Sequence, residues 1–357
     1  MPFHFWSVTF FVLGCVVGSF LNVCIHRMPR DLSIVSPPSH CPHCKYSIPF
    51  YLNLPLVTWL MLAGKCRNCG APISIRYFLV ELLTGVAFLA CWLAFGMYHP
   101  GLALVYSIFL AGLITATFID FEHYIIPDEI TYGGAVAGFG FSLFFPALHD
   151  AASPGESLAR SLIGILGGSG IVYGVLRLGK LLFGRQQVKL PGESLIVFTE
   201  HSLHLPGEEI PYEEIFYRRT DTIVVVARRI ELIDRCYAEA KVQLSPNRLQ
   251  IGPDRFAPEE VLHMEMLSAT LVLPREAMGL GDVKFMAAIG AFLGWQGAVF
   301  SLMASSVIGA VAGISMILLR HRASSRVPYG PYLALAAVIW LFGRQFFTSL
   351  LLQWSNR

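Results

Sequence analysis

Long apolar runs separated by short polar segments cover most of the chain. An α-helix needs roughly 20 mainly apolar residues to cross the hydrocarbon core of a bilayer, and these runs have about that length. The predicted crossings are 3–25, 77–97, 101–120, 129–147, 158–180, 283–298, 299–319 and 329–350. The pattern therefore predicts an all-α polytopic membrane bundle of about eight transmembrane helices.

Composition and charge support this interpretation and orient the helices. Only 14% of the 357 residues are charged, whereas soluble domains carry about a quarter. Six Lys and Arg residues lie in 26–76 and three in 320–328, but none in 98–100 or 148–157. Because cytoplasmic loops are rich in Lys and Arg, the first two segments are predicted to be cytoplasmic and both termini to lie outside.

Residues 185–275 differ from the rest of the chain. They hold 25 of the 50 Lys, Arg, Asp and Glu residues, and their apolar runs are short and rich in β-branched residues. We therefore expect a small, soluble, β-rich insert on the cytoplasmic side. The insert also repeats its pattern at an offset of 46 residues, so that Glu213-Glu214-Ile215 matches Glu259-Glu260-Val261. The repeat predicts two strand–loop–strand units, and the alternative is chance similarity between two amphipathic strand regions.

Two aspartates lie where apolar runs meet polar segments. Asp120 ends the third run, and Asp282 opens the sixth run after Gly279-Leu280-Gly281. An ionisable group at such a depth is costly and indicates a functional site by default. The structural alternative is a helix cap, which suits Asp128 better than Asp120 because Asp128 directly precedes an apolar stretch. Asp282 is also suited to be a cap.

As a pair, the two aspartates indicate acid–base chemistry. Two carboxylates brought close together cannot both ionise easily, so one of them holds a proton. The charged carboxylate can then activate a water while the protonated one donates to the scissile carbonyl. The chain contains no serine-nucleophile motif and no HExxH zinc motif. Asp120 and Asp282 are therefore predicted to be the catalytic residues of an aspartic endopeptidase that cuts at the membrane face.

Four of the eight cysteines form two CxxC pairs. Cys41 and Cys44 are followed, after 21 residues, by Cys66 and Cys69. This spacing is typical of a tetrahedral zinc site with four thiolate ligands, in which no coordination position stays open for catalysis. Disulfides are rare in the cytoplasm, so two disulfides or free thiols are the weaker alternatives. We predict a structural Zn²⁺ in the 26–76 loop.

These residues belong to an ordered series of motifs that resembles the type IV prepilin peptidase family, a class of aspartic membrane proteases with a GxGD motif. The matching segments are Gly18–Val23 with Arg27 and Pro29, Ile48-Pro49 and Asn53–Pro55 between the CxxC pairs, Arg76–Leu83, Ile119-Asp120 with Pro127-Asp128, Met278–Lys284, Gly290–Gly294 and Tyr329–Ala334. The resemblance extends over most of the chain.

The resemblance implies cleavage after a Gly in the leader peptide of type IV prepilins and pseudopilins. It places the enzyme in the bacterial inner membrane with its active site facing the cytoplasm. It also implies methylation of the new N-terminal residue with S-adenosylmethionine, which is typical of members that carry the cysteine loop. No Gly-rich nucleotide fingerprint supports this cofactor independently, so a peptidase without methyltransferase activity is the alternative.

Further candidates for contact with substrate or cofactor accompany the dyad. They are Gly279, Gly281, Lys284, Asp128, Glu81 and Arg76. The glycines allow a sharp turn and close approach to a substrate strand. The four charged residues are equally well explained as ordinary charges at the membrane interface. The expected partners are prepilins and the lipid bilayer, and the net charge of +2 is too small to indicate nucleic acid.

The chain departs from the family pattern at two places. Leu52 stands where family members usually have Asp before the Asn, which affects the loop and not the catalytic pair. The insert at 185–275 is not a feature associated with the family that the chain resembles. Because it directly precedes Gly279, it is suited to contact substrate or an assembly partner, and an inert embellishment is the equal alternative.

The expected organisation has five parts. They are a first transmembrane helix at 1–25, a cytoplasmic zinc-binding loop at 26–76, four helices with the first catalytic Asp at 77–184, the insert at 185–275, and the GxGD motif with three helices at 276–357. Two other functions compete with the peptidase. A transporter that uses the Asp pair as a proton relay needs acids near mid-bilayer, and an assembly protein needs no working dyad.

Overall fold

The computed structural model describes residues 3–183, 185–216, 221–274, 279–319 and 328–355. Met278 of the GxGD segment and the three arginines of the predicted 320–328 link lie outside these residues. The chain divides into two compact units. One contains Met1–Tyr173 and Leu280–Arg357, and the other contains Gly174–Gly279.

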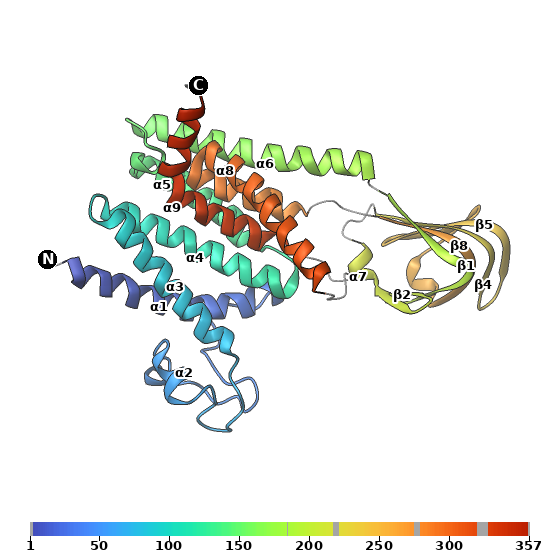
Figure 1. Ribbon diagram of the computed structural model, residues 1–357. Coiled ribbons are helices and arrows are strands. Elements are labelled where there is room, and N and C mark those ends of the chain that lie inside the picture. The colour runs from blue at the N-terminus through green and yellow to red at the C-terminus, as the bar shows by residue number, and fades with distance from the viewer. Residues whose placement is uncertain (1–2, 184, 217–220, 275–278, 320–327, 356–357) are drawn as a thin grey trace. The chain divides into compact units, whose positions relative to one another are not determined.

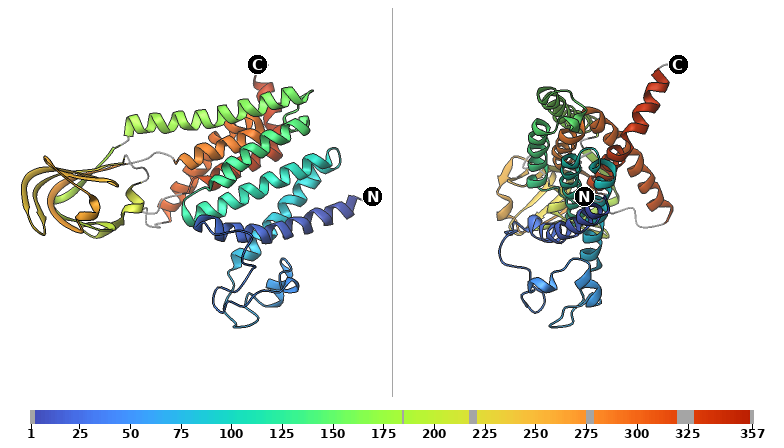
Figure 2. Two further views of the ribbon diagram at one scale, coloured as in Figure 1. Left: turned by 180° about the vertical axis from the view of Figure 1, so that it is seen from behind. Right: turned by 90° about the vertical axis from the view of Figure 1, so that its left-hand side faces the viewer.

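Long helices that run beside one another make up most of the first unit (Figures 1 and 2). They are α1 (Phe3–Arg27), α3 (Ile75–Cys91), α4 (Pro100–His123), α5 (Asp128–Phe144), α6 (Pro154–Phe183, whose last residues belong to the second unit), α8 (Leu280–Leu318) and α9 (Gly330–Ser355). Within the described residues, five spans are long and apolar enough to cross a membrane: Phe3–Arg30, Ile75–Gly96, Pro100–His123, Pro154–Gly179 and Leu280–Met316. The predicted helical membrane architecture is confirmed, and the count of eight crossings stays a prediction.

Helix α8 is broken at Gly294. This residue has φ +69° and ψ 179°, which no helical residue adopts and which an L side chain would strain. Two helical arms follow one another across this point, as expected for the separate crossings 283–298 and 299–319, although the break falls four residues before the predicted boundary. A kink at glycine is a usual way to redirect a membrane helix.

Small residues allow the helices to approach closely. A methyl group added at Gly138 of α5 would lie 2.8 Å from Cβ of Ala291 in α8. A methyl group at Gly164 of α6 would collide with the carbonyl of Gly290, also in α8. Membrane helices associate largely through such close van der Waals packing, because lipid supplies no hydrophobic driving force between them. These contacts fix α8, which carries Asp282, between α5 and α6.

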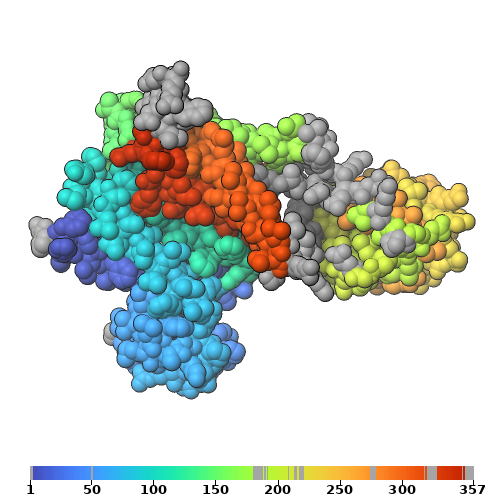
Figure 3. Space-filling model, in the orientation of Figure 1, coloured from blue at the N-terminus to red at the C-terminus, as the bar shows by residue number. Residues whose placement is uncertain are grey.

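A compact cysteine module follows α1. It contains the 3₁₀ turns Met28–Arg30 and Phe50–Leu52 and the short helix α2 (Val57–Met61), and it ends where Ser74 caps α3 by accepting the backbone N–H of Arg76. Figure 3 shows the module as a lobe of its own on the surface of the first unit. The module carries all four cysteines of the CxxC pairs.

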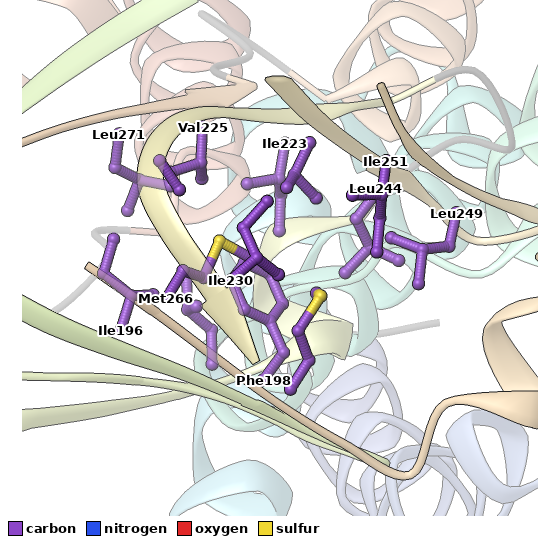
Figure 4. Packing of buried hydrophobic residues seen from close by; sticks show 14 of the residues in the cluster. Ile196, Phe198, Ile223, Val225, Ile230, Leu244, Leu249, Ile251, Met266 and Leu271 are labelled. Carbon is purple, nitrogen blue, oxygen red and sulfur yellow. The ribbon is translucent and has the colours of Figure 1, made fainter. Parts of the chain in front are cut away.

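The second unit contains one eight-stranded antiparallel sheet, so the predicted β-rich insert is present. The strands are β1 (Arg185–Thr199), β2 (Ser202–Leu205), β3 (Glu208–Pro211), β4 (Ile223–Leu232), β5 (Cys236–Ser245), β6 (Arg248–Ile251), β7 (Asp254–Phe256) and β8 (His263–Pro274). Buried residues of several strands point to one face, and they alternate with more exposed ones at the start of β4, from Ile223 and Val225. Their side chains form the buried core shown in Figure 4.

The sheet is built from two halves of the insert, and the elements of each half follow one another in a similar order. Strands β1, β2 and β3, the helical turn α7 (Tyr212–Ile215) and β4 are followed by β5, β6, β7, the turn Pro258–Glu260 and β8. The order across the sheet is β3-β2-β1-β8-β4-β5-β6-β7. The last strand of each half therefore pairs with the first strand of the other half. This exchange makes the two halves one structure with a shared core.

Candidate active site and metal centre

Asp120 lies in the last turn of α4 and is only 5% exposed. Its Oδ2 accepts a hydrogen bond of 2.9 Å from the backbone N–H of Gly330, the first residue of α9. The N-terminus of a helix carries a partial positive charge that stabilises a nearby carboxylate. Tyr124, with φ +55°, ends α4 and turns the chain away from this point. Asp120 is thereby held by a segment 210 residues away.

Asp282 lies in the first turn of α8 and is 9% exposed. Because α8 begins at Leu280, Asp282 is inside the helix and does not occupy the cap position. A carboxylate in the first turn is also favoured by the helix dipole, so the position alone does not separate catalysis from helix stabilisation. Both aspartates lie at helix ends, whereas a proton relay requires acids near mid-bilayer.

Ile126 joins the segments that carry the two aspartates. A methyl group added at Gly281, the residue before Asp282, would lie 3.6 Å from Cβ of Ile126. A methyl group added at Gly330 would lie 3.1 Å from Cδ1 of the same side chain and 2.7 Å from Oδ2 of Asp120. The loop after α4, the start of α8 and the start of α9 therefore converge on one buried side chain.

A second contact between α5 and α8 lies beside this point. The ammonium of Lys284 is 2.6 Å from Oδ1 of Asp128 and 4.9 Å from the centre of the Tyr132 ring. Both charged side chains are partly exposed, at 29% and 59%. Exposed ion pairs contribute about 0–1 kcal/mol, so this pair orients the two helices more than it stabilises them. The contact favours a positioning role for Lys284 and Asp128.

The other two charged candidates belong to α3 and have different surroundings. Arg76 forms an ion pair with Glu122, two residues after Asp120, and its guanidinium lies 5.3 Å from the centre of the Tyr77 ring. It thus ties the start of α3 to the end of α4. Glu81 is 8% exposed and accepts a hydrogen bond of 2.7 Å from the backbone N–H of Leu56 in the cysteine module.

The four cysteines of the module form one cluster. Their sulfur atoms all lie within 4.8 Å of one another, with 3.9 Å between Cys41 and Cys69 and 4.0 Å between Cys44 and Cys66. These separations are far longer than a disulfide bond of about 2.05 Å. Four sulfurs about 2.3 Å from a tetrahedral zinc ion would be about 3.8 Å apart. The cluster can therefore bind a metal ion.

Each CxxC pair sits in the same type of knuckle. Lys45 N donates to Cys41 O and Gly70 N donates to Cys66 O, and both donors have positive φ, at +57° and +72°. The turn directs backbone N–H groups towards the sulfurs, as the hydrogen bonds to Cys66 show. A hydrogen bond from Asn68, with a second one from the backbone of Tyr46, lowers the pKa of the Cys44 thiol to about 6. The turns thus favour the thiolate, the form that binds metal, at Cys44 and Cys66, whereas desolvation and the neighbouring thiols raise the pKa of Cys69 to about 11.

Several of these residues escaped the sequence analysis. Glu122, Ile126 and the role of Gly330 are the main examples. Gly330 lies in the Tyr329–Ala334 motif of the family resemblance, and Glu122 follows Asp120 so closely that its charge at a helix end was a usable signal. Nothing in the local pattern of Ile126 distinguishes it from other apolar residues.

The comparisons with known proteins agree with the placement of these motifs. Residues 12–95 match the model of the bacterial peptidase A24 N-terminal domain, and residues 107–190 and 261–314 match that of the type IV leader peptidase family. A prepilin leader peptidase/N-methyltransferase from Dichelobacter nodosus is 36% identical over 207 residues, which are 50% of this chain and 68% of that protein. The chain belongs to the type IV leader peptidase family.

Two further relatives in this family carry the same printed name, prepilin leader peptidase/N-methyltransferase. The protein from Aeromonas hydrophila is 28% identical over 95% of this chain and 92% of its own length. The one from Myxococcus xanthus is 46% identical over 164 residues, which are 45% of this chain and 46% of that protein. The family model leaves out 191–260, which lies within the β-rich insert. No solved structure matches the chain.

Proposed function

We propose that this chain is a membrane aspartic endopeptidase that removes the leader peptide of type IV prepilins and pseudopilins and methylates the new N-terminal residue. The observation that carries the proposal is the alignment of 95% of the chain with a prepilin leader peptidase/N-methyltransferase. The convergence of the Asp120 segment and the GxGD segment on Ile126 gives it a physical basis.

Asp120 and Asp282 carry out the cleavage in this proposal. One carboxylate is charged and takes a proton from a water molecule, and the other is protonated and donates to the oxygen of the scissile carbonyl. The water oxygen bonds to the carbonyl carbon, the C–N bond then breaks, and the leaving nitrogen takes up a proton. The N–H of Gly330 holds the Asp120 carboxylate in place through this sequence.

The cysteine module holds one structural zinc ion in this account. Cys41, Cys44, Cys66 and Cys69 supply four thiolates, so the metal has no open position for substrate. A zinc ion bound there would fix the two knuckles, which belong to the same module as Leu56, whose backbone N–H contacts Glu81. The metal would therefore maintain the shape of the module beside α3 without taking part in bond cleavage.

Methyl transfer follows cleavage. When bound, S-adenosylmethionine would supply an electrophilic methyl group carried on a positively charged sulfur. The new N-terminal amine would accept this methyl group, and its nitrogen would then lose a proton to water. The chain must hold the peptide amine and the methyl donor next to each other and exclude other nucleophiles.

The proposed setting is the bacterial inner membrane, crossed eight times, with the active site and the zinc module facing the cytoplasm. Support comes from the five membrane-length helices and from the six basic residues of 26–76. The five-part organisation of the sequence, including the insert at 185–275, is part of the same proposal. The insert is suited to contact an assembly partner or substrate outside the catalytic machinery.

A purified sample of the full chain tests the function. It is incubated in detergent or lipid with a prepilin and S-adenosylmethionine, and the products are measured by mass spectrometry. The expected product lacks the leader after its Gly and is heavier by one methyl group. An uncut prepilin would contradict the peptidase proposal, and a cut but unmethylated product would contradict its methyltransferase part.

A further inference from the structure

A cavity of about 700 Å³ lies between the cysteine module and helices α1 and α3. Small-molecule sites occupy about 300–1,000 Å³, so the cavity has the size of such a site. It lies entirely within the first unit, and the motifs assigned to peptide cleavage do not line it. Its walls include Trp59 and Tyr77, and its polar lining includes Asn22 and Glu81.

Asn22, one of the residues that line this cavity, has an unused hydrogen-bond acceptor. The side chain is 2% exposed, and its Nδ2 donates to the carbonyl of Gly18 at 3.3 Å and that of Tyr77 at 3.0 Å. Because both neighbours are acceptors, the reversed amide would place oxygen against oxygen. The orientation is therefore fixed, and Oδ1 is buried without a hydrogen-bond partner. Buried polar atoms of this kind usually have a partner, so this one indicates a ligand.

Glu81 adds a buried negative charge to the same lining. One of its oxygens accepts the N–H of Leu56, and within the parts of the chain that the structure describes it has no ion-pair partner. A carboxylate that is 8% exposed normally requires a cation nearby. Since Asn22 and Glu81 come from neighbouring helices, α1 and α3, they form a lining that suits a positively charged group.

The remaining walls suit an aromatic ring and an anion. The Trp59 indole donates to the carbonyl of Ile73, which fixes the ring as a flat apolar wall. Arg27 donates to the carbonyls of Ser33 and Pro37 at 2.9 and 2.7 Å, which holds the segment after α1 against the cavity. Lys45 and Arg67 supply positive charge among the lining residues. The lining thus combines acceptors, aromatic faces and cations in one enclosure.

We propose that this cavity binds the methyl donor S-adenosylmethionine, which joins a purine nucleoside to an amino acid through a positively charged sulfur. Glu81 and Asn22 Oδ1 hold the cationic part, the aromatic walls hold the purine, and Lys45 or Arg67 faces the carboxylate. This assignment rests on the proposed methyltransferase function. It gives the cysteine module a role: the zinc knuckles form one side of the cofactor site.

Direct binding to the full-length protein in lipid nanodiscs tests the assignment. The probes are sinefungin, which carries an amine in place of the sulfonium, and S-adenosylhomocysteine, whose sulfur is neutral. We expect wild type to bind both and to prefer sinefungin. Asn22→Leu and Glu81→Gln should each weaken sinefungin binding at least 10-fold, and Glu81→Gln should remove most of the preference for the cationic probe.

A matched control and a second measurement keep the test independent of folding. Ser107→Ala removes a buried hydroxyl in α4 that bonds to Ala103 O and does not line the cavity, so it should bind like wild type. Ultraviolet cross-linking of radiolabelled S-adenosylmethionine should label peptides of α1, α3 or the cysteine module. Bound zinc is measured in Asn22→Leu and Glu81→Gln as evidence that the cysteine module is intact.

The outcomes separate this inference from the function on which it rests. If wild type cleaves and methylates, but both variants bind the probes as tightly as wild type and the label falls elsewhere, the cavity assignment is overturned and the function stands. If wild type releases only unmethylated product, the methyltransferase function itself fails. Loss of binding in both variants, with bound zinc at the wild-type level, is the result that we expect.

Discussion

Gly330 donates its backbone N–H to Oδ2 of Asp120 at 2.9 Å, although 210 residues separate them in the sequence. The contact depends on the absence of a side chain, since an added methyl group would lie 2.7 Å from that oxygen. The start of α9 therefore acts as a fixed partner for the proposed catalytic carboxylate. It also explains why a motif at the last helix accompanies the two aspartate motifs.

Gly330→Ala should reduce prepilin cleavage at least 10-fold. The added methyl must displace either the Asp120 carboxylate or the start of α9, and small misplacements of a catalytic group are costly. Initial rates of leader removal measure the effect. Gly133→Ala is the matched control, because nothing lies within 4 Å of a methyl group added there in α5. Equal rates for Gly330→Ala and wild type would contradict the proposed role of this contact.

The zinc proposal predicts one zinc ion per chain. Cys41→Ser combined with Cys66→Ser removes one ligand from each knuckle and should abolish bound zinc, measured by elemental analysis of purified protein. Cys236→Ser replaces an exposed cysteine in the insert and should leave the metal content unchanged. Full zinc content in the double variant would refute the four-cysteine site.

His149 should make the stability of the protein depend on pH. It lies outside the membrane-length helices, in the turn Pro146–His149, and its ring bonds to Ser157 Oγ and Ala291 O. Burial lowers the pKa of His149 from its ordinary value to about 4. Between about pH 6.5 and pH 4 the unfolded chain thus binds a proton that the folded chain does not, and stability falls as pH falls.

Thermal unfolding in detergent at pH 7 and pH 5 measures this dependence. The free energy of unfolding should decrease by up to about 1.4 kcal/mol for each pH unit within the window. His149→Gln removes the titrating group and should flatten the pH dependence, whatever its effect at pH 7. Parallel pH profiles for wild type and the variant would show that His149 is not the group responsible.

Local sequence patterns predicted those parts of the structure that local physics determines. The apolar runs identified the helices because bilayer thickness sets their length, and the CxxC spacing identified the metal cluster because each knuckle closes within a few residues. A break between the crossings 283–298 and 299–319 was expected, but its position at Gly294 was not, since a helix can break at any of several adjacent residues. The helical break therefore lies earlier than the apolar pattern suggested.

Features that depend on contacts between distant segments could not be predicted from the sequence. The link between Glu81 and the cysteine module depends on the hydrogen bond that Glu81 accepts from the backbone N–H of Leu56. The unused acceptor of Asn22 can be recognised only in the structure, where Nδ2 of the same amide donates to the carbonyl of Tyr77. Neither residue carries a local signal beyond its charge or polarity. Likewise, the convergence on Ile126 depends on how α4, α8 and α9 pack, which periodicity does not determine.

The catalytic role of the two aspartates is the central claim, and a cleavage assay with isosteric variants tests it most directly. Asp120→Asn and Asp282→Asn are compared with wild type by initial rate, with bound zinc measured as evidence of intact folding. Each variant should lose at least about 100-fold in rate, the lower bound for a general acid or base. The double variant should be little worse than either single variant, because the pair acts as a unit. Cleavage at the wild-type rate by both single variants would contradict the account.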